Sequence, residues 1–480
     1  MKKRIRIVSM LAVAFFACNG FAQAKKWTLQ ECVDYAIKNN ISIKLSTLDA
    51  ETALIAKSDS WGAFLPTAGF QGNHSWNIGL NQNITTGLLE NQTTQFTSLG
   101  FNAGIDIYKG LQNLNRLKRA RLAIIASQYK QTKMEEDVAL NVANAYLQIL
   151  FNKENLRVQE QQLSYDTSQK ERIEQLVDGG AVPKGDLLDI NATIASDNQK
   201  KIAAENALLL SKLSLAQLMQ LDDFLNLDTE DSDYPDDASA VMLQSPADIY
   251  EKAKGIRTDL KAAQTDVEVA EKDLSIARGA YHPTLQGFYS FTTRAAYSDK
   301  IIGFQPNTGQ PTTVIGYVEG TNQNVLQPNS EPILGRRDPI IDQFNDNKGH
   351  NFGLSLNIPI LNGFTVRNNV QRSKVELERS KITLQQKELD LERNVYTAFT
   401  DAKGAQKSYE AAISAANARE QSLEYAKERY EVGLINIFDL NQAQTLSVNA
   451  QSEVLRAKYD FIFKVKILEF YFGIPIYQKQ

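Results

Sequence analysis

The chain carries two copies of one sequence pattern at a constant spacing. The pattern Ile-x-Ile-x-x-Gly at 105–110 returns at 358–363, and the same spacing of 253 joins Gly180 to Gly433. The spacing holds without a gap over more than seventy residues. The helices of the two copies should therefore have equal lengths, as a mechanical rod requires.

A second motif places an insert in the second copy. Gly-Ala-aromatic-x-Pro-Thr occurs at 62–67 and again at 279–284, so Gly62 and Gly279 are offset by only 217 in the numbering. The difference between the two spacings means that the second copy should be longer between 284 and 358. We therefore predict a first structural repeat over 25–221 and a second over 246–480.

Most of both copies reads as helix, with apolar or small residues at i, i+3 and i+4. Residues 111–180 contain no proline, and one helix of that length would be about 105 Å long. Shorter helices are expected over 186–221 and 246–281. Long helical hairpins are thus predicted over 111–221, with its tip near 180, and over 364–474, with its tip near 433. Such helices build a rod and not a globule.

Four segments alternate between apolar and polar residues, as half-buried strands do. They lie at about 67–80, 97–109, 284–293 and 351–362. Each is close to the roughly 9–11 residues with which a tilted strand crosses a bilayer. Their polar faces carry Asn, Ser and Gly, which suit a wet lumen; two hairpins of a soluble sandwich are the alternative. The connections 81–96 and 294–350 predict exposed loops.

Four residues mark the junctions between helix and strand: Pro66, Gly110, Pro283 and Gly363. The prolines are read as stops, because proline breaks a helix and restricts the residue before it. The linker 222–245 carries eight acidic residues and no Lys or Arg. We interpret it as a solvated belt at the middle of a rod, and not as a binding site.

Residues 1–24 read as a signal peptide. Four cations precede an apolar run over 7–17, and Ala-Gln-Ala at 22–24 is a cleavage site. Lipidation at Cys18 is the alternative. After this segment no apolar run reaches the length of about 18 residues that a membrane-spanning helix needs, so a membrane crossing would be made by strands.

Composition excludes several classes of function. A net charge of −4 disfavours nucleic-acid binding. Three histidines and two cysteines, scattered along the chain, predict neither a metal cluster nor a disulfide framework. Cys32, the lone cysteine after the signal, is expected as a small buried side chain. We expect no cofactor, and with no paired carboxylates or nucleophile and base in view, no enzyme.

Four strands cannot close a barrel, and lipid does not tolerate an open sheet edge. Oligomerisation is therefore expected. The predicted fold class is an α+β membrane protein in which a trimer forms a twelve-stranded β-barrel, continued by a hollow α-helical coiled-coil barrel. A dimer would close eight strands, with its interior filled by side chains.

Two stretches carry a resemblance to a known family. They are Trp-Thr-Leu-Gln-Glu-Cys-Val-Asp-Tyr-Ala at 27–36, and Arg-Tyr-Glu-Val-Gly-Leu at 429–434 followed by Asp439. With the two Pro-Thr turns, they make the chain similar to the TolC-like outer-membrane efflux protein family over nearly the whole mature length.

The resemblance implies a homotrimeric channel-tunnel in the outer membrane of a Gram-negative bacterium. Its helical duct would cross the periplasm and dock an adaptor protein that serves an inner-membrane pump. The family pattern places Gly180, Gly433 and Leu434 at the adaptor-facing tips. It places Asp439 at the periplasmic constriction, with Asp186 and Tyr430 in the bonds that hold the entrance shut.

The chain departs from the family pattern at two positions. Ile435 stands where a gating arginine is expected, and Gln442 where a second ring of aspartates is expected, so the resemblance implies no salt-bridged lock. Simpler local roles also remain: Gly180 and Gly433 as helix C-caps, and Asp186 and Asp439 as N-caps. A periplasmic or surface structural coiled coil is the rival class, but it leaves the four strands unexplained.

Overall fold

The computed structural model of the chain describes residues 26–83, 87–231 and 240–475. The expected signal peptide, the Cys18 lipidation site and residues 232–239 of the acidic linker lie outside the described residues. The chain divides into two compact units. We call them the helical unit, formed by the described residues of 26–55, 121–270 and 376–475, and the sheet unit, formed by the described residues of 56–120 and 271–375.

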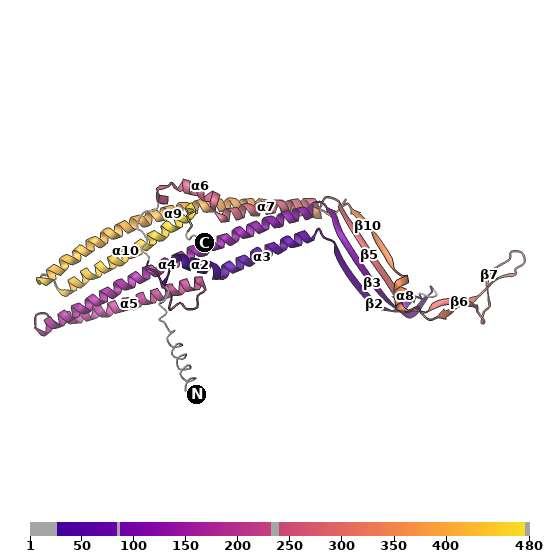
Figure 1. Cartoon of the computed structure of the whole chain (residues 1–480), viewed down its shortest axis with the longest axis horizontal. Helices are drawn as coiled ribbons and strands as arrows, with labels where there is room; N and C mark the ends of the chain where they lie inside the picture. The colour runs from indigo at the N-terminus through magenta and orange to yellow at the C-terminus, as the bar shows by residue number, and fades with distance from the viewer. Residues whose placement is uncertain (1–25, 84–86, 232–239, 476–480) are drawn as a thin grey trace, which may run out of the picture. The chain divides into compact units, whose positions relative to one another are not determined.

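The helices occur in pairs of equal length, one from each repeat (Figure 1). The pairs are α4 (Gln112–Asp178) and α9 (Thr365–Glu431) with 67 residues each, α5 (Lys184–Met219) and α10 (Ile437–Phe472) with 36, α3 (Ile41–Gly62) and α7 (Thr258–Gly279) with 22, and α2 (Leu29–Asn39) and α6 (Pro246–Ile256) with 11. The expected equality is confirmed. No helix in the described residues is both long and apolar enough to cross a membrane.

The single helix expected over 246–281 is wrong, because Arg257 divides it into α6 and α7. The Arg257 backbone is not helical, with φ at −57° and ψ at 124°. Its buried guanidinium lies 3.3 Å from Asp259, 3.5 Å from Glu136 and 4.4 Å from the centre of the Phe470 ring. These contacts surround the break, and those with Glu136 and Phe470 are tertiary.

Matched capping residues start the equivalent helices α2 and α6. The Thr28 hydroxyl accepts a hydrogen bond from the Glu31 amide, and the Glu31 carboxylate accepts one from the Thr28 amide. The Ser245 hydroxyl accepts in the same way from the Asp248 amide. Each cap satisfies amides that have no partner within the helix.

Equivalent positions build two cores in the helical unit. The first gathers Val142, Ala145 and Tyr146 from α4 with Leu215 from α5. The second gathers the residues 253 positions later in α9, namely Val395, Ala398 and the partly buried Phe399, together with Leu468 from α10. Cys32 is buried in the first core, as expected.

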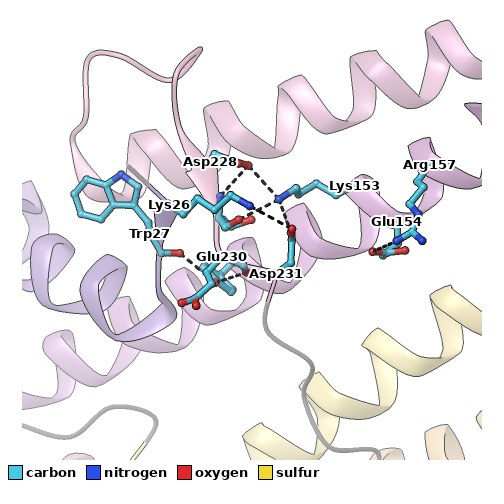
Figure 2. Close-up of polar contacts among 10 residues, drawn as sticks. Lys26, Trp27, Lys153, Glu154, Arg157, Asp228, Glu230 and Asp231 are labelled. Carbon is cyan, nitrogen blue, oxygen red and sulfur yellow. Dashed lines mark hydrogen bonds and ion pairs between the residues drawn. The ribbon is translucent and has the colours of Figure 1, made fainter. Parts of the chain in front are cut away.

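The first core is closed by a network that the acidic linker supplies (Figure 2). β1 (Lys26–Trp27) pairs in parallel with β4 (Asp228–Thr229). The Lys153 ammonium lies 3.1 Å from Asp228 and 2.6 Å from Asp231. Burial lowers the pKa of Lys153, but its bonds to these two carboxylates outweigh burial and raise it. The described part of the linker is therefore anchored to α4, while the Asp231 side chain stays 62% exposed.

The sheet unit contains four antiparallel strands in the order β10-β5-β3-β2 (Figure 1). They are β2 (Thr67–Gln82), β3 (Leu89–Lys109), β5 (Thr284–Ala296) and β10 (Gly349–Asn357). Phe70 pairs with Phe101, and Phe101 with Phe291, so their side chains share one face. That face continues through Ile78, which is 83% exposed, and Phe352, which is 78% exposed.

Two predicted boundaries of these strands are wrong. The expected loop 81–96 is largely strand, because the polar residues 89–96 of β3 pair with residues 75–82 of β2. β10 ends at Asn357, short of the expected 362. Pro359 follows closely, and proline cannot donate to a strand ladder.

The insert expected in the second repeat has structure of its own, which corrects the loop expected over 294–350. β6 (Lys300–Pro306) pairs with β9 (Ser330–Gly335), and β7 (Thr312–Tyr317) with β8 (Asn324–Pro328). The short helix α8 (Ile340–Asp346) follows. Thr293 of β5 donates to the Phe344 carbonyl at 2.7 Å and so anchors this helix.

Candidate functional site

Both helical hairpins turn through the same backbone motif. Gly180 and Gly433 have φ angles of +70° and +74°, and a Cβ at either position would meet no atom within 4 Å. The next amides, of Ala181 and Leu434, reach back to the carbonyls of Leu176 and Arg429 at 2.8 Å. Both glycines therefore have the expected capping role, and the left-handed backbone alone explains their identity.

The two aspartates after these turns are not the N-caps that the sequence suggested. Pro183 is the N-cap of α5, without a side-chain bond, and Asn436 caps α10 by accepting from the Asp439 amide at 2.9 Å. Asp186 and Asp439 each lie in the first turn, where a negative charge is favourable beside the helix N-terminus. Their carboxylates remain free for another role. Asn436 three residues before Asp439 is the sequence signal that identifies the cap.

One apolar cluster joins the two hairpins near their turns. It is formed by Ile173 of α4, Ile190 of α5, Leu423 of α9 and Ile437 of α10, all of them buried. Tyr430 packs against this cluster. The cluster places the ends of all four helices in one packed layer of the helical unit.

Asp186 and Tyr430 lie close enough to interact electrostatically. Burial raises the pKa of the Tyr430 hydroxyl, the Asp186 carboxylate raises it further, and the Arg172 guanidinium opposes both. No hydrogen bond joins Asp186 to Tyr430 within the described chain. The structure thus brings these two residues close together, and their part in closing the entrance stays a prediction.

Asp439 lines an open cavity of about 490 Å³ between α9 and α10. Tyr425, Arg429 and Ile435 contribute to the same cavity. Arg429 precedes the turn and lines this cavity, although Ile435 occupies the position of the expected arginine. Leu434 beside the turn is 69% exposed. Gln442 lies one turn further along α10.

Sequence reasoning missed a pair of acids deeper in the first hairpin. Asp166 of α4 is 1% exposed and Asp197 of α5 is 3% exposed. Asp166 lies seven residues before the buried Ile173, and Asp197 seven residues after the buried Ile190. Seven-residue spacing keeps a side chain on the same helix face. An acid on a buried stripe is the signal that could have found the pair.

The junctions at the other end of these helices differ in crowding. Gly110 and Gly363 have φ angles of +57° and +56°. A Cβ on Gly110 would overlap the Gly279 carbonyl oxygen, whereas a Cβ on Gly363 would meet nothing within 4 Å. Pro66 and Pro283 directly precede β2 and β5, as expected of residues that stop a helix before a strand.

Comparison with known proteins agrees with this architecture. The profile of the outer membrane efflux protein family matches residues 47–220 and 249–469. Outer membrane protein TolC of Vibrio cholerae serotype O1 is 23% identical over 470 residues, which cover 95% of this chain and 93% of the relative. TolC of Escherichia coli K12 is 21% identical over 481 residues, covering 96% and 84%.

The fold matches a solved structure of the same architecture. The outer membrane protein VceC of Vibrio cholerae superposes with a TM-score of 0.71 at 15% identity, covering 93% of this chain and 96% of that one. The family profile spans most of both repeats. The chain therefore belongs to the outer membrane efflux protein family and is an outer-membrane efflux channel.

Proposed function

We propose that three copies of this chain form a passive exit duct, in which the sheets close a twelve-stranded barrel and the long helices form a periplasmic tunnel. The two structural repeats, 25–221 and 246–480, then contribute six equivalent units. The observation that carries the proposal is a sheet with an exposed apolar face and two edge strands, β2 and β10, that the internal repeat makes complementary.

The repeat specifies how those edges meet. Within the chain, β3 of the first repeat pairs with β5 of the second. Their repeat equivalents are β10 and β2, which lie at opposite edges of the sheet and cannot pair within one copy. Transferring the observed pair Leu99 and Thr293 gives Phe352 of one copy beside Trp76 of the next. An open edge is costly in lipid, so this pairing supplies the missing ladder.

The helix–strand junctions support the same pairing between neighbouring copies. Gly110 and Gly279 pass each other so closely that neither could carry a Cβ without displacing the other's backbone. Their equivalents, Gly363 and Gly62, each have open space in the single chain. Gly62 of a neighbouring copy would complete the crossing at Gly363, and this accounts for a glycine at both positions.

The hairpin ends supply the docking surface for an adaptor protein that links the duct to an inner-membrane pump. Gly180, Gly433 and Leu434 lie at the turns, and the neighbouring Val432 and Phe438 are also largely exposed. Exposed apolar side chains at a helix turn are typical of a protein contact. Asp439, with Asp186 and Tyr430 beside the same cluster, would line the periplasmic constriction, where three copies of a carboxylate attract cations.

Cysteine cross-linking tests the assembly. Trp76→Cys and Phe352→Cys combined should give covalent dimers and closed trimers in outer-membrane preparations under mild oxidation. Each single variant is the control and should remain monomeric in denaturing gels. A double variant that inserts in the outer membrane, exports cargo and yields only monomers would contradict the proposed pairing.

A further inference from the structure

A buried carboxyl pair lies inside the first helical hairpin. Asp166 is twelve residues before the end of α4 and Asp197 is thirteen residues after the start of α5. The two helices run in opposite directions from one turn, so both acids lie about 18–20 Å from it. Both are almost completely buried, at 1% and 3% exposed.

The donors around the pair leave one oxygen without a partner. The Gln162 side-chain amide donates to Asp166 Oδ2 at 2.6 Å, and the Gln444 side chain of α10 donates to Gln162 Oε1 at 2.7 Å. Lys200 donates to Asp197 Oδ1 at 2.9 Å. Asp197 Oδ2 is buried, and within the described residues no amide, hydroxyl or ammonium group donates to it. Two ionised carboxylates can only accept, so a proton on Asp166 is what would satisfy this oxygen.

Burial and the neighbouring Asp197 carboxyl favour that proton. Burial raises the pKa of Asp166, hydrogen bonding to Asp197 raises it further, and Gln162 and Lys200 oppose these effects; the resulting pKa is about 7. Among the neighbours, α4 adds Tyr165, while α9 contributes Lys427, whose ammonium lies 5.3 Å from the Tyr165 ring centre. From α10, Gln444 contributes an uncharged amide. Lys200 is the cation that pairs with Asp197 and also attracts Asp166.

We propose that Asp166 and Asp197 share one proton, and that this proton couples the packing of α4 against α5 to the pH around the hairpin. With the proton present, Asp166 donates to Asp197 and both carboxyls are satisfied. When it leaves to solvent, two buried negative charges face each other with one ammonium beside them. Repulsion and desolvation then weaken the hairpin.

The second hairpin lacks this carboxyl pair. The repeat equivalents of Asp166 and Asp197 are Arg419 and Ala450. A helical hairpin of the same length and the same turn thus forms without a carboxyl pair. The acids are therefore dispensable for building a hairpin, and the inference does not depend on the proposed trimer or adaptor.

Hydrogen exchange on the assembled protein in detergent tests the proposal. After correction for the intrinsic rate, peptides from 160–200 should open about 10-fold more readily at pH 8 than at pH 6, since one proton with a pKa near 7 is lost over that range. The second hairpin, 413–453, is the internal control and should show no such change.

The variant Asp166→Asn should abolish the pH dependence, because an amide donates to Asp197 at every pH. Asp189→Asn, at an exposed aspartate of the same hairpin, is the matched control and should behave as the wild type. The infrared band of a protonated carboxyl should be present at pH 6 and absent from Asp166→Asn. If Asp166→Asn does not fold, Asp197→Asn is used in its place and should likewise abolish the pH dependence. Persistence of the pH effect in a folded variant, or its absence from the wild type, would overturn the proposal.

Discussion

The two helical hairpins have nearly the same backbone and different interiors. Each pairs a 67-residue helix with a 36-residue helix, and each turns through a glycine with a left-handed backbone. The first hairpin buries Asp166 and Asp197, where the second has an exposed arginine and an alanine. Duplication thus preserves helix length and turn geometry, which set how the units fit together, while the buried side chains diverge.

The same contrast holds in the two cores. The Tyr146 hydroxyl has one hydrogen, which it shares between the carbonyls of Trp27 and Glu230, at 3.2 and 3.0 Å. The equivalent Phe399 has no hydroxyl. Only the first core uses this polar group to hold the N-terminal strand and the linker, so the two repeats are held by different contacts.

The largest expected effect is on the unfolding free energy. It should distinguish a glycine whose Cα is crowded by other atoms from one with open space around it. Gly110→Ala would force a methyl group into the Gly279 carbonyl oxygen, so we expect a loss of about 4 kcal/mol or more in unfolding free energy. Gly433→Ala is the control, because it has a similar φ and open space; its cost should be about 1–2 kcal/mol. Chemical unfolding in detergent measures both. Equal costs would show that backbone conformation alone selects these glycines.

The next effect is a dependence of stability on pH that arises in the first hairpin. The pKa of Asp166 is about 7 in the folded chain, against an ordinary value of 3.8. Between these values the unfolded chain binds fewer protons, so the unfolding free energy should fall as pH rises, by up to about 1.4 kcal/mol per pH unit, and level off above pH 7.

Unfolding curves from pH 5 to pH 8 measure this slope. Asp166→Asn should flatten it and should raise stability at pH 8. An unchanged slope in this variant would assign the dependence to other groups.

A smaller effect is expected from the polar contact of the first core. Tyr146→Phe leaves the two carbonyls without their hydroxyl donor and should cost about 1–2 kcal/mol. Tyr396→Phe, at an exposed tyrosine of α9, should be neutral. Thermal unfolding followed by circular dichroism distinguishes them. A neutral Tyr146→Phe would mean that apolar packing alone holds the N-terminal strand.

The smallest change in stability is expected at the hairpin ends, where the effect should appear in conductance. Neither Asp186 nor Asp439 is an N-cap. Replacement of either by alanine should therefore not lower the unfolding free energy by the roughly 1 kcal/mol that the loss of a cap costs. In planar-bilayer recordings, Asp439→Ala should reduce cation selectivity and relieve block by a trivalent cation. Asp186→Ala should mainly raise the resting conductance. Selectivity and block that survive Asp439→Ala would remove this residue from the constriction.

Local signals in the sequence predicted much of the architecture. Helix lengths, the turns at Gly180 and Gly433, and the four strands follow from apolar periodicity, glycine and proline positions and the two repeat spacings. These features depend on residues near one another in the chain, so they can be predicted without a structure. The repeat even specifies the pairing proposed between β10 and β2, because it transfers a register observed within the chain.

The tertiary structure alone decided features that depend on distant partners. β3 extends into a polar stretch because β2 supplies its hydrogen bonds, and Arg257, which follows the end of α6, is buried against Glu136 and Phe470. The proton-sharing pair joins acids that lie on two different helices. Charge patterns along a chain do not show which side chains face each other in a core, and burial, which raises the pKa of Asp166, exists only once the helices pack.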